Sequence, residues 1–135
     1  MIDIKTAVNY AFSVKVQTAY LPDQSSIDDN QYAFAYTVTI VNTGNIAAQL
    51  LSRHWIIRDA NNHVQEVKGD GVIGLKPMLQ PDESFEYTSG TVLNTTDGEM
   101  RGSYQLMAVD GTCFEATIAP FVLMQPSFLT NRVLH

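Results

Sequence analysis

The sequence of 135 residues is poor in charge, in cysteine and in long apolar runs. Its single cysteine, Cys113, cannot form a disulfide within the chain, and in its apolar surroundings we expect a small buried residue. The longest apolar run, residues 118–124, is far shorter than the roughly 18 residues that a membrane span needs. Residues 1–12 lack the apolar stretch of a signal peptide. We therefore expect a cytoplasmic chain without membrane insertion.

Basic residues are scarce as well. Eight Lys and Arg stand against 14 Asp and Glu, which gives a formal net charge of −6. Because proteins bind nucleic acid largely by neutralising phosphates, and no run of Lys or Arg is present, we predict no nucleic-acid partner. The apolar fraction of 45% is too high for a disordered chain. A chain of this length can bury a core without a disulfide or metal, so we expect a single domain over residues 1–135.

A helical repeat is missing, since no window of eleven or more residues shows a period of 3.6. Instead, large apolar residues alternate with small or polar ones, most clearly in residues 32–42. One face of that stretch carries Tyr32, Phe34, Tyr36, Val38 and Ile40. Similar extended patterns occupy residues 12–20, 50–59, 63–69, 84–90, 100–109 and 113–124. About seven short strands separated by turns predict an all-β antiparallel β-sandwich, with Trp55 buried between its sheets.

Three glycines, Gly69, Gly71 and Gly74, have the spacing G-x-G-x-x-G of dinucleotide-binding folds. In those folds the motif follows a parallel strand and opens a helix, whose N-terminus holds pyrophosphate. Here Pro77 and Pro81 would break a helix within its first turns. The motif is therefore not interpreted as a dinucleotide fingerprint.

Two interpretations of residues 69–74 remain. In the first, the glycines let a connection adopt positive φ or pass close to other backbone. In the second, successive amides form a nest that binds pyrophosphate or a nucleotide, with Lys68, Lys76 and Arg53 supplying positive charge.

No catalytic or metal-binding pattern stands out. The histidines are widely separated, and no group of Cys, His, Asp and Glu has the spacing of a zinc site. Asp59 and Asn61 begin like a calcium loop, but Val64 stands where that loop requires glycine, so we interpret the stretch as a hairpin turn. No G-x-S-x-G motif is present. We predict no catalytic residues, no metal site and no cofactor.

Several longer motifs occur in order along the chain. They are YAFAYTVTIVN, LLSRHWIIRDAN, VQEVKGDGVIGLKPMLQP, SFEYTSG, MRGSYQLM and FEATIAPFVL. Over residues 10–125 the sequence resembles the ApaG family, a bacterial family that also occurs as a domain of some eukaryotic F-box proteins. One departure is Asp82, where the family usually follows its proline with glycine, and this departure alters one turn.

The resemblance implies a fibronectin type III-like or immunoglobulin-like sandwich. The family's role is poorly defined: it is linked genetically with cobalt resistance and magnesium efflux, and its gene often lies beside those for diadenosine tetraphosphate hydrolysis and ribosomal RNA dimethylation. The eukaryotic domain is a protein-interaction module. The glycine motif, here Gly69, Gly71 and Gly74, has prompted a suggested pyrophosphate or nucleotide role. No established catalytic residue exists to carry over.

These observations leave three functional hypotheses. The first is a non-enzymatic module that binds a protein partner through sandwich loops or an exposed strand edge. The second is pyrophosphate or nucleotide binding at residues 69–74. The third, a phosphohydrolase, is disfavoured because the sequence offers neither a metal cluster nor a convincing base. Exposed edge strands could also pair two copies into a homodimer.

Overall fold

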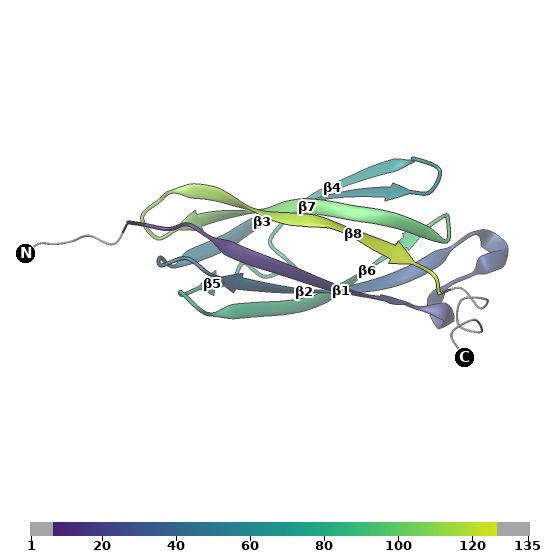
Figure 1. Ribbon diagram of the computed structural model, residues 1–135, viewed down its shortest axis with the longest axis horizontal. Coiled ribbons are helices and arrows are strands. Elements are labelled where there is room, and N and C mark those ends of the chain that lie inside the picture. The colour runs from purple at the N-terminus through teal and green to yellow at the C-terminus, as the bar shows by residue number, and fades with distance from the viewer. Residues whose placement is uncertain (1–6, 127–135) are drawn as a thin grey trace, which may run out of the picture.

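The computed structural model describes residues 7–126 and consists of two stacked layers of strands (Figure 1). The strands are β1 (Phe12–Tyr20), β2 (Tyr32–Asn42), β3 (Ala48–Asp59), β4 (Val64–Asp70), β5 (Met78–Leu79), β6 (Ser84–Leu93), β7 (Asp97–Ala108) and β8 (Cys113–Met124). Two 3₁₀ turns, η1 (Pro22–Gln24) and η2 (Ile27–Asp29), join β1 to β2. Within residues 7–126 no helix is long and apolar enough to cross a membrane.

The strands form one sheet of order β1-β2-β6 and a larger sheet of order β4-β3-β7-β8, in which β5 pairs with the beginning of β3. Every pairing is antiparallel. This arrangement confirms the predicted fibronectin type III-like or immunoglobulin-like sandwich. The short strand β5 lies outside the stretches predicted as strands, since its two residues are too few to show an alternating pattern.

The core lies between the two sheets, where alternate residues of each strand point inward. On β2 all five predicted inward residues are buried, and Val38 and Ile40 have no exposed surface. Trp55 is also buried, as predicted, and its ring centroid lies 5.3 Å from that of Tyr36 and 6.3 Å from that of Tyr104. Burial of such side chains contributes roughly 1.5–3 kcal/mol each to folding.

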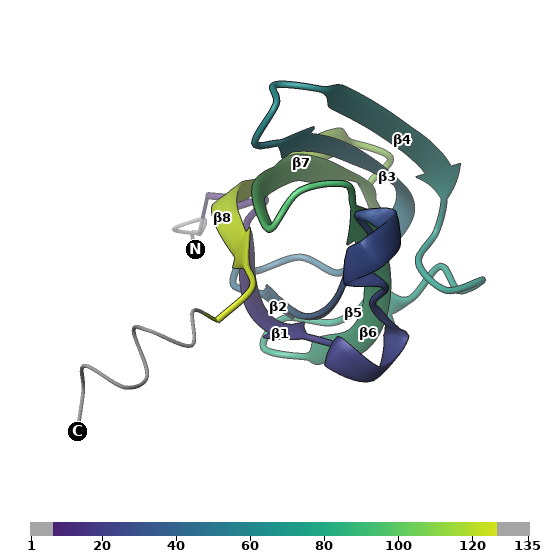
Figure 2. The same cartoon turned by 90° about the vertical axis from the view of Figure 1, so that its right-hand side faces the viewer.

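The two sides of the sandwich differ. On one side β1 lies beside β8 (Figure 2), and the rings of Tyr10 and Phe12 pack 5.5 and 5.8 Å from the ring of Phe114. The Tyr10 hydroxyl donates a 2.6 Å hydrogen bond to Asp110, which lowers the pKa of that carboxyl. On the other side β4 and β6 are the free edges of their sheets and are not paired with each other. The sandwich is therefore open along β4 and β6.

The expected burial of Cys113 is wrong, since this residue is exposed. It opens β8, where Ala116 and Ile118 point into the core. Alternation along the strand therefore directs Cys113 outward. Apolar neighbours in sequence did not reveal which face of the strand the cysteine occupies.

Candidate functional site

Gly69 is a residue of β4 rather than of a loop. It pairs with Arg53 across the β3–β4 ladder. A Cβ atom on Gly69 would lie 2.8 Å from the carbon and both terminal nitrogens of the Arg53 guanidinium. The missing side chain therefore makes room for the arginine head group.

Gly71 begins the connection after β4, and its backbone requires glycine. Its φ is +62°, and a Cβ atom there would lie 2.3 Å from the Leu75 carbonyl oxygen. Its amide donates a 2.8 Å hydrogen bond to the carbonyl of Leu51 on β3. Because antiparallel pairs alternate along a ladder, the amide of Gly69, two residues earlier, also points toward β3. The amides of Gly69 and Gly71 therefore point toward β3 and not toward a position where an anion could bind.

Gly74 belongs to a tight turn. Val72 and Leu75 exchange two backbone hydrogen bonds of 2.8 Å, and the residues between them, Ile73 and Gly74, have φ of 42° and 79°. Positive φ at both central positions is the requirement of a type I′ turn. No helix follows this turn, since the chain continues to β5. A pyrophosphate-binding helix N-terminus is therefore absent from this part of the described chain.

Lys76 lies apart from the other two basic residues named with the glycines. Arg53, Lys68 and Gly69 line a hollow of about 460 Å³ in the larger sheet, together with Ser52, His54, Asp70, Gln105 and Glu115. Gly74 and Lys76 are not among its lining residues. The carbonyl of Lys76 instead accepts a 3.1 Å hydrogen bond from Gln49 at the beginning of β3.

The outward face of the larger sheet carries a hydrogen-bond network centred on Gln105. Ser52 donates to its side-chain oxygen at 2.8 Å, and its nitrogen donates to Ser103 at 2.8 Å and to Glu115 at 3.4 Å. These bonds join β3, β7 and β8 across the sheet surface. The polar side chains of this network are therefore hydrogen-bonded to one another.

A nucleophilic mechanism would need a serine, a histidine and an aspartate together, and His54, Ser89 and Asp59 do not meet in this fold. Nε2 of His54 lies 2.5 Å from Oε2 of Glu66 on the outward face. Ser89 belongs to β6 in the other sheet, and Asp59 is buried at the end of β3. The side chains that a nucleophilic mechanism would need together therefore lie on different parts of the fold.

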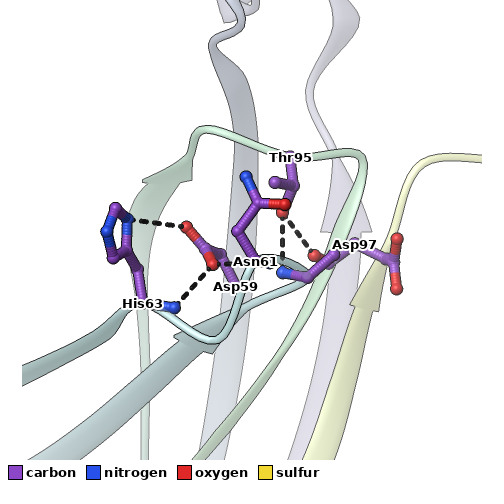
Figure 3. Close-up of polar contacts among 6 residues, drawn as sticks. Asp59, Asn61, His63, Thr95 and Asp97 are labelled. Carbon is purple, nitrogen blue, oxygen red and sulfur yellow. Dashed lines mark hydrogen bonds and ion pairs between the residues drawn. The ribbon is translucent and has the colours of Figure 1, made fainter.

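The stretch that begins like a calcium loop is a hairpin turn (Figure 3). Oδ1 of Asp59 accepts hydrogen bonds from the amides of Asn61 and His63 at 2.8 and 3.0 Å, which holds the β3–β4 turn. The Thr95 hydroxyl accepts from the amide of Ala60 at 3.0 Å and links this turn to the β6–β7 connection. Residues 7–126 contain no group of three or more His, Cys, Asp or Glu that could hold a metal ion.

The open side of the sandwich contains two adjoining hollows, which we call the edge groove. The first, of about 260 Å³, is lined by Tyr36, Arg53, Trp55, Ile57, Gln65, Val67, Ser89, Gly90 and Thr91. The second, of about 110 Å³, is lined by Ile57, Asp59, His63, Val64, Gln65, Val92, Leu93 and Asn94. Both include Ile57 and Gln65, so the edge groove follows the space between β4 and β6.

Arg53 is the charged residue of the first hollow. It lies two positions before Trp55 on β3, so both side chains share the face that looks toward the other sheet. Its Nη1 donates to the carbonyls of Asp70 and Gly71 at 3.1 and 3.0 Å. These two bonds hold the guanidinium over Gly69 at the wall of the edge groove.

Two tyrosines lie behind the edge groove and join the sheets. The hydroxyls of Tyr87 on β6 and Tyr104 on β7 form a short hydrogen bond in the interior. Burial raises the pKa of Tyr87 to about 12, against a smaller opposing effect of the hydrogen bond with Tyr104. Burial also raises the pKa of Tyr104.

We expect these tyrosines to make the protein labile to alkali. A tyrosine ionises near pH 10 in the unfolded chain, whereas Tyr87 in the folded protein keeps its proton until about pH 12. Their stabilising effect is intact below pH 10 and is lost as the pH rises toward 12. Between these values the free energy of unfolding should fall by about 1.4 kcal/mol per pH unit for each buried tyrosine.

Urea unfolding from pH 8 to pH 12 tests this expectation. The Tyr87→Phe variant should start from lower stability at pH 8, because Tyr104 loses its partner, and then fall less steeply above pH 10. Equal slopes for the two proteins would contradict the assignment.

Comparisons with known proteins match this fold. A family model described as the ApaG domain matches residues 22–108. The ApaG protein of Methylobacillus flagellatus is 63% identical over 126 residues, covering 93% of this chain and 95% of that protein. The chain belongs to the ApaG family. A crystal structure of the putative ApaA protein from Bordetella pertussis has a TM-score of 0.85 and 51% identity, covering 87% of this chain and 95% of that one.

Asp82, named above as a departure from the family pattern, lies in the turn before β6, and its φ is +71°. This left-handed conformation is easy for glycine and tolerated by aspartate. Its amide donates to the carbonyl of Asn42 at 2.8 Å, which attaches the turn to β2.

The edge groove was missed by the sequence interpretation, although one signal for it was present. Arg53 and Trp55 are two residues apart on a predicted strand, so they share a face, and a charged residue beside a core tryptophan marks the border of the core. The partner strand β4 and its register, which place Gly69 beneath Arg53, are not visible in the pattern of one strand.

Proposed function

We propose that this ApaG protein is a non-catalytic binding module that holds an extended segment of a partner protein along the free edge of β6. The observation that carries the proposal is the edge groove, which lies directly beside that edge. An extended peptide can add to an exposed sheet edge through backbone hydrogen bonds, while adjacent pockets select alternate side chains.

The composition of the two free edges favours β6 over β4. Glu66, Lys68 and Asp70 give β4 three charged side chains in seven residues, which is a common protection against pairing with another chain. The ten residues of β6 include one charged side chain, Glu86. Valine, threonine and serine make up much of the rest, and such residues suit a strand that accepts a neighbour.

The proposal is tested by selecting random peptides displayed on phage against the protein. Val92 is 54% exposed on β6 and lines the second hollow, so Val92→Lys should place a charge on the binding edge. Val122, 55% exposed on β8, provides the matched control Val122→Lys. We expect selected peptides to lose about tenfold or more in affinity for the Val92→Lys protein and to bind the control as they bind the original.

Peptides that bind both variants alike would place the binding surface elsewhere. A library that yields no peptide in repeated selections would count against the function itself.

A second candidate is binding of pyrophosphate or a nucleotide near residues 69–74. In its favour, Lys68 and Gly69 line the same 460 Å³ hollow. Against it, the Gly71 amide is bonded to Leu51, and acidic side chains share the hollow. Calorimetric titration with pyrophosphate and ATP distinguishes this candidate from peptide binding. Saturable heat that disappears in the Lys68→Gln protein would establish it.

The family's genetic association with cobalt resistance and magnesium efflux is compatible with a binding module. Residues 7–126 have no cluster suited to a metal ion, so we propose that any influence on metal transport acts through a protein partner.

A further inference from the structure

One side of the Arg53 guanidinium makes no hydrogen bond or ion pair with the described residues. Among residues 7–126 the ion pairs join His54 to Glu66 and His63 to Asp59, and none includes Arg53. Nη1 has two carbonyl acceptors, whereas Nε and Nη2 have no acceptor within the same residues. No buried side-chain nitrogen or oxygen in this part of the chain lacks a partner, so these two nitrogens are reached by solvent.

The unused nitrogens form the geometry that a carboxylate needs. Nε and Nη2 lie on one edge of the guanidinium plane and present two parallel N–H groups, which fit the two oxygens of a carboxylate. The carbonyls of Asp70 and Gly71 hold Nη1 and thereby fix the orientation of this edge. A preorganised arginine loses less side-chain freedom when it binds an anion.

The surroundings favour a single carboxylate over a phosphate group. Arg53 is the one charged residue lining the 260 Å³ hollow, whose other polar groups are Tyr36, Gln65, Ser89 and Thr91. One cation balances one carboxylate, whereas a phosphate dianion or pyrophosphate would need more positive charge than this hollow provides. The ring of Trp55 lines the same hollow and supplies an apolar wall for the stem of a bound side chain.

We propose that Arg53 recognises an aspartate or glutamate side chain carried by the extended segment on β6, near Ser89 and Thr91. This inference rests on the proposed function and specifies the chemistry of the partner: a strand-forming segment with an acidic residue that points into the edge groove. The carboxylate binds side-on to Nε and Nη2, and the backbone of the segment pairs with β6.

The first arm of the test uses N-acetylglutamate amide and follows the side-chain Nε–H signals of the arginines by NMR. We expect the signal of Arg53 to shift saturably and that of Arg58, an exposed arginine on the same strand, to stay in place. Pyrophosphate serves as the competing anion. A larger saturable shift of Arg53 with pyrophosphate than with the carboxylate would overturn the assignment.

The second arm compares the acetylated peptide amides TVTETVT and TVTQTVT, with the fluorescence of Trp55, the single tryptophan, as the readout. The glutamate peptide should bind about tenfold more tightly than the glutamine peptide, as expected for charge-assisted hydrogen bonds. This ratio should fall to about one in the Arg53→Gln protein and persist in Arg58→Gln. Arg53→Lys, which retains charge but lacks the two parallel N–H groups, should keep only part of the preference and guards against misfolding of Arg53→Gln.

The outcomes separate this inference from the proposed function. Equal binding of both peptides along β6 would overturn the role of Arg53 and leave the strand-binding function standing. A shift of Arg53 by N-acetylglutamate amide without binding of either peptide would support the carboxylate site and contradict strand addition. No effect in either arm would overturn both.

Discussion

Replacement of Gly102 by alanine is expected to cost about 4 kcal/mol or more of folding free energy, among the largest effects of any single substitution. Gly102 on β7 faces Trp55 across the β3–β7 ladder. A Cβ atom there would lie 2.0 Å from the carbonyl oxygen of His54, a backbone atom that cannot move without disturbing the ladder. The His54 carbonyl belongs to β3, which also carries Arg53 and Trp55. We therefore expect the edge groove to lose its shape as well.

Gly74→Ala provides the matched control for this substitution. The added methyl group would meet nothing within 4 Å, so its cost comes from the φ of +79° alone. We expect about 1 kcal/mol there. Chemical denaturation of the two variants measures the difference, and a Gly102→Ala protein as stable as Gly74→Ala would contradict the close approach of β3 and β7.

The second large effect is expected at Asn42, a polar residue with no exposed surface at the end of β2. Its side-chain nitrogen donates to the carbonyls of Ile46 and Leu79 at 2.9 and 3.0 Å, and its oxygen accepts from the amide of Gly44 at 2.9 Å. It thereby ties β5 and the β2–β3 connection to the smaller sheet. Asn42→Ala removes these bonds in the interior and should lower the free energy of unfolding by about 3 kcal/mol.

Asn45, three residues away, is a suitable comparison because it makes similar bonds at the surface. Its side chain accepts from the amide of Asn9 at 2.7 Å and donates to the carbonyl of Ala7 at 2.8 Å. Water can replace these partners, so Asn45→Ala should cost less than about 1 kcal/mol. Equal losses in thermal unfolding of the two variants would show that burial does not govern the role of Asn42.

Strand patterns predicted the architecture well where alternation is strong. The stretches predicted at residues 12–20, 32–42 and 113–124 coincide with β1, β2 and β8. Strand ends were less visible where turn-forming residues lie inside a strand. β6 continues past the predicted end at residue 90 to Leu93, and β7 begins at Asp97, before the predicted start at residue 100. Pairing with neighbouring strands outweighs local turn preference at both places.

The candidate site was less predictable than the fold because it depends on which strands are neighbours. The glycine spacing correctly drew attention to residues 69–74, and the proline argument against a following helix agrees with the structure. The pairing of Gly69 with Arg53, by contrast, requires the register of β4 on β3. The edge groove requires in addition that the outer edges of β4 and β6 are both free and lie on the same side of the sandwich.

Amide hydrogen exchange of β6 in the presence of the glutamate peptide tests the central claim most directly. If an extended segment adds to this strand, the amides between Ser84 and Leu93 that point away from β2 gain hydrogen-bond partners. Their exchange should slow by about tenfold or more at saturation. The amides of β8, on the closed side, should be unaffected. Slowed exchange confined to β4, to β8 or to residues 71–77, with β6 unchanged, would contradict the account.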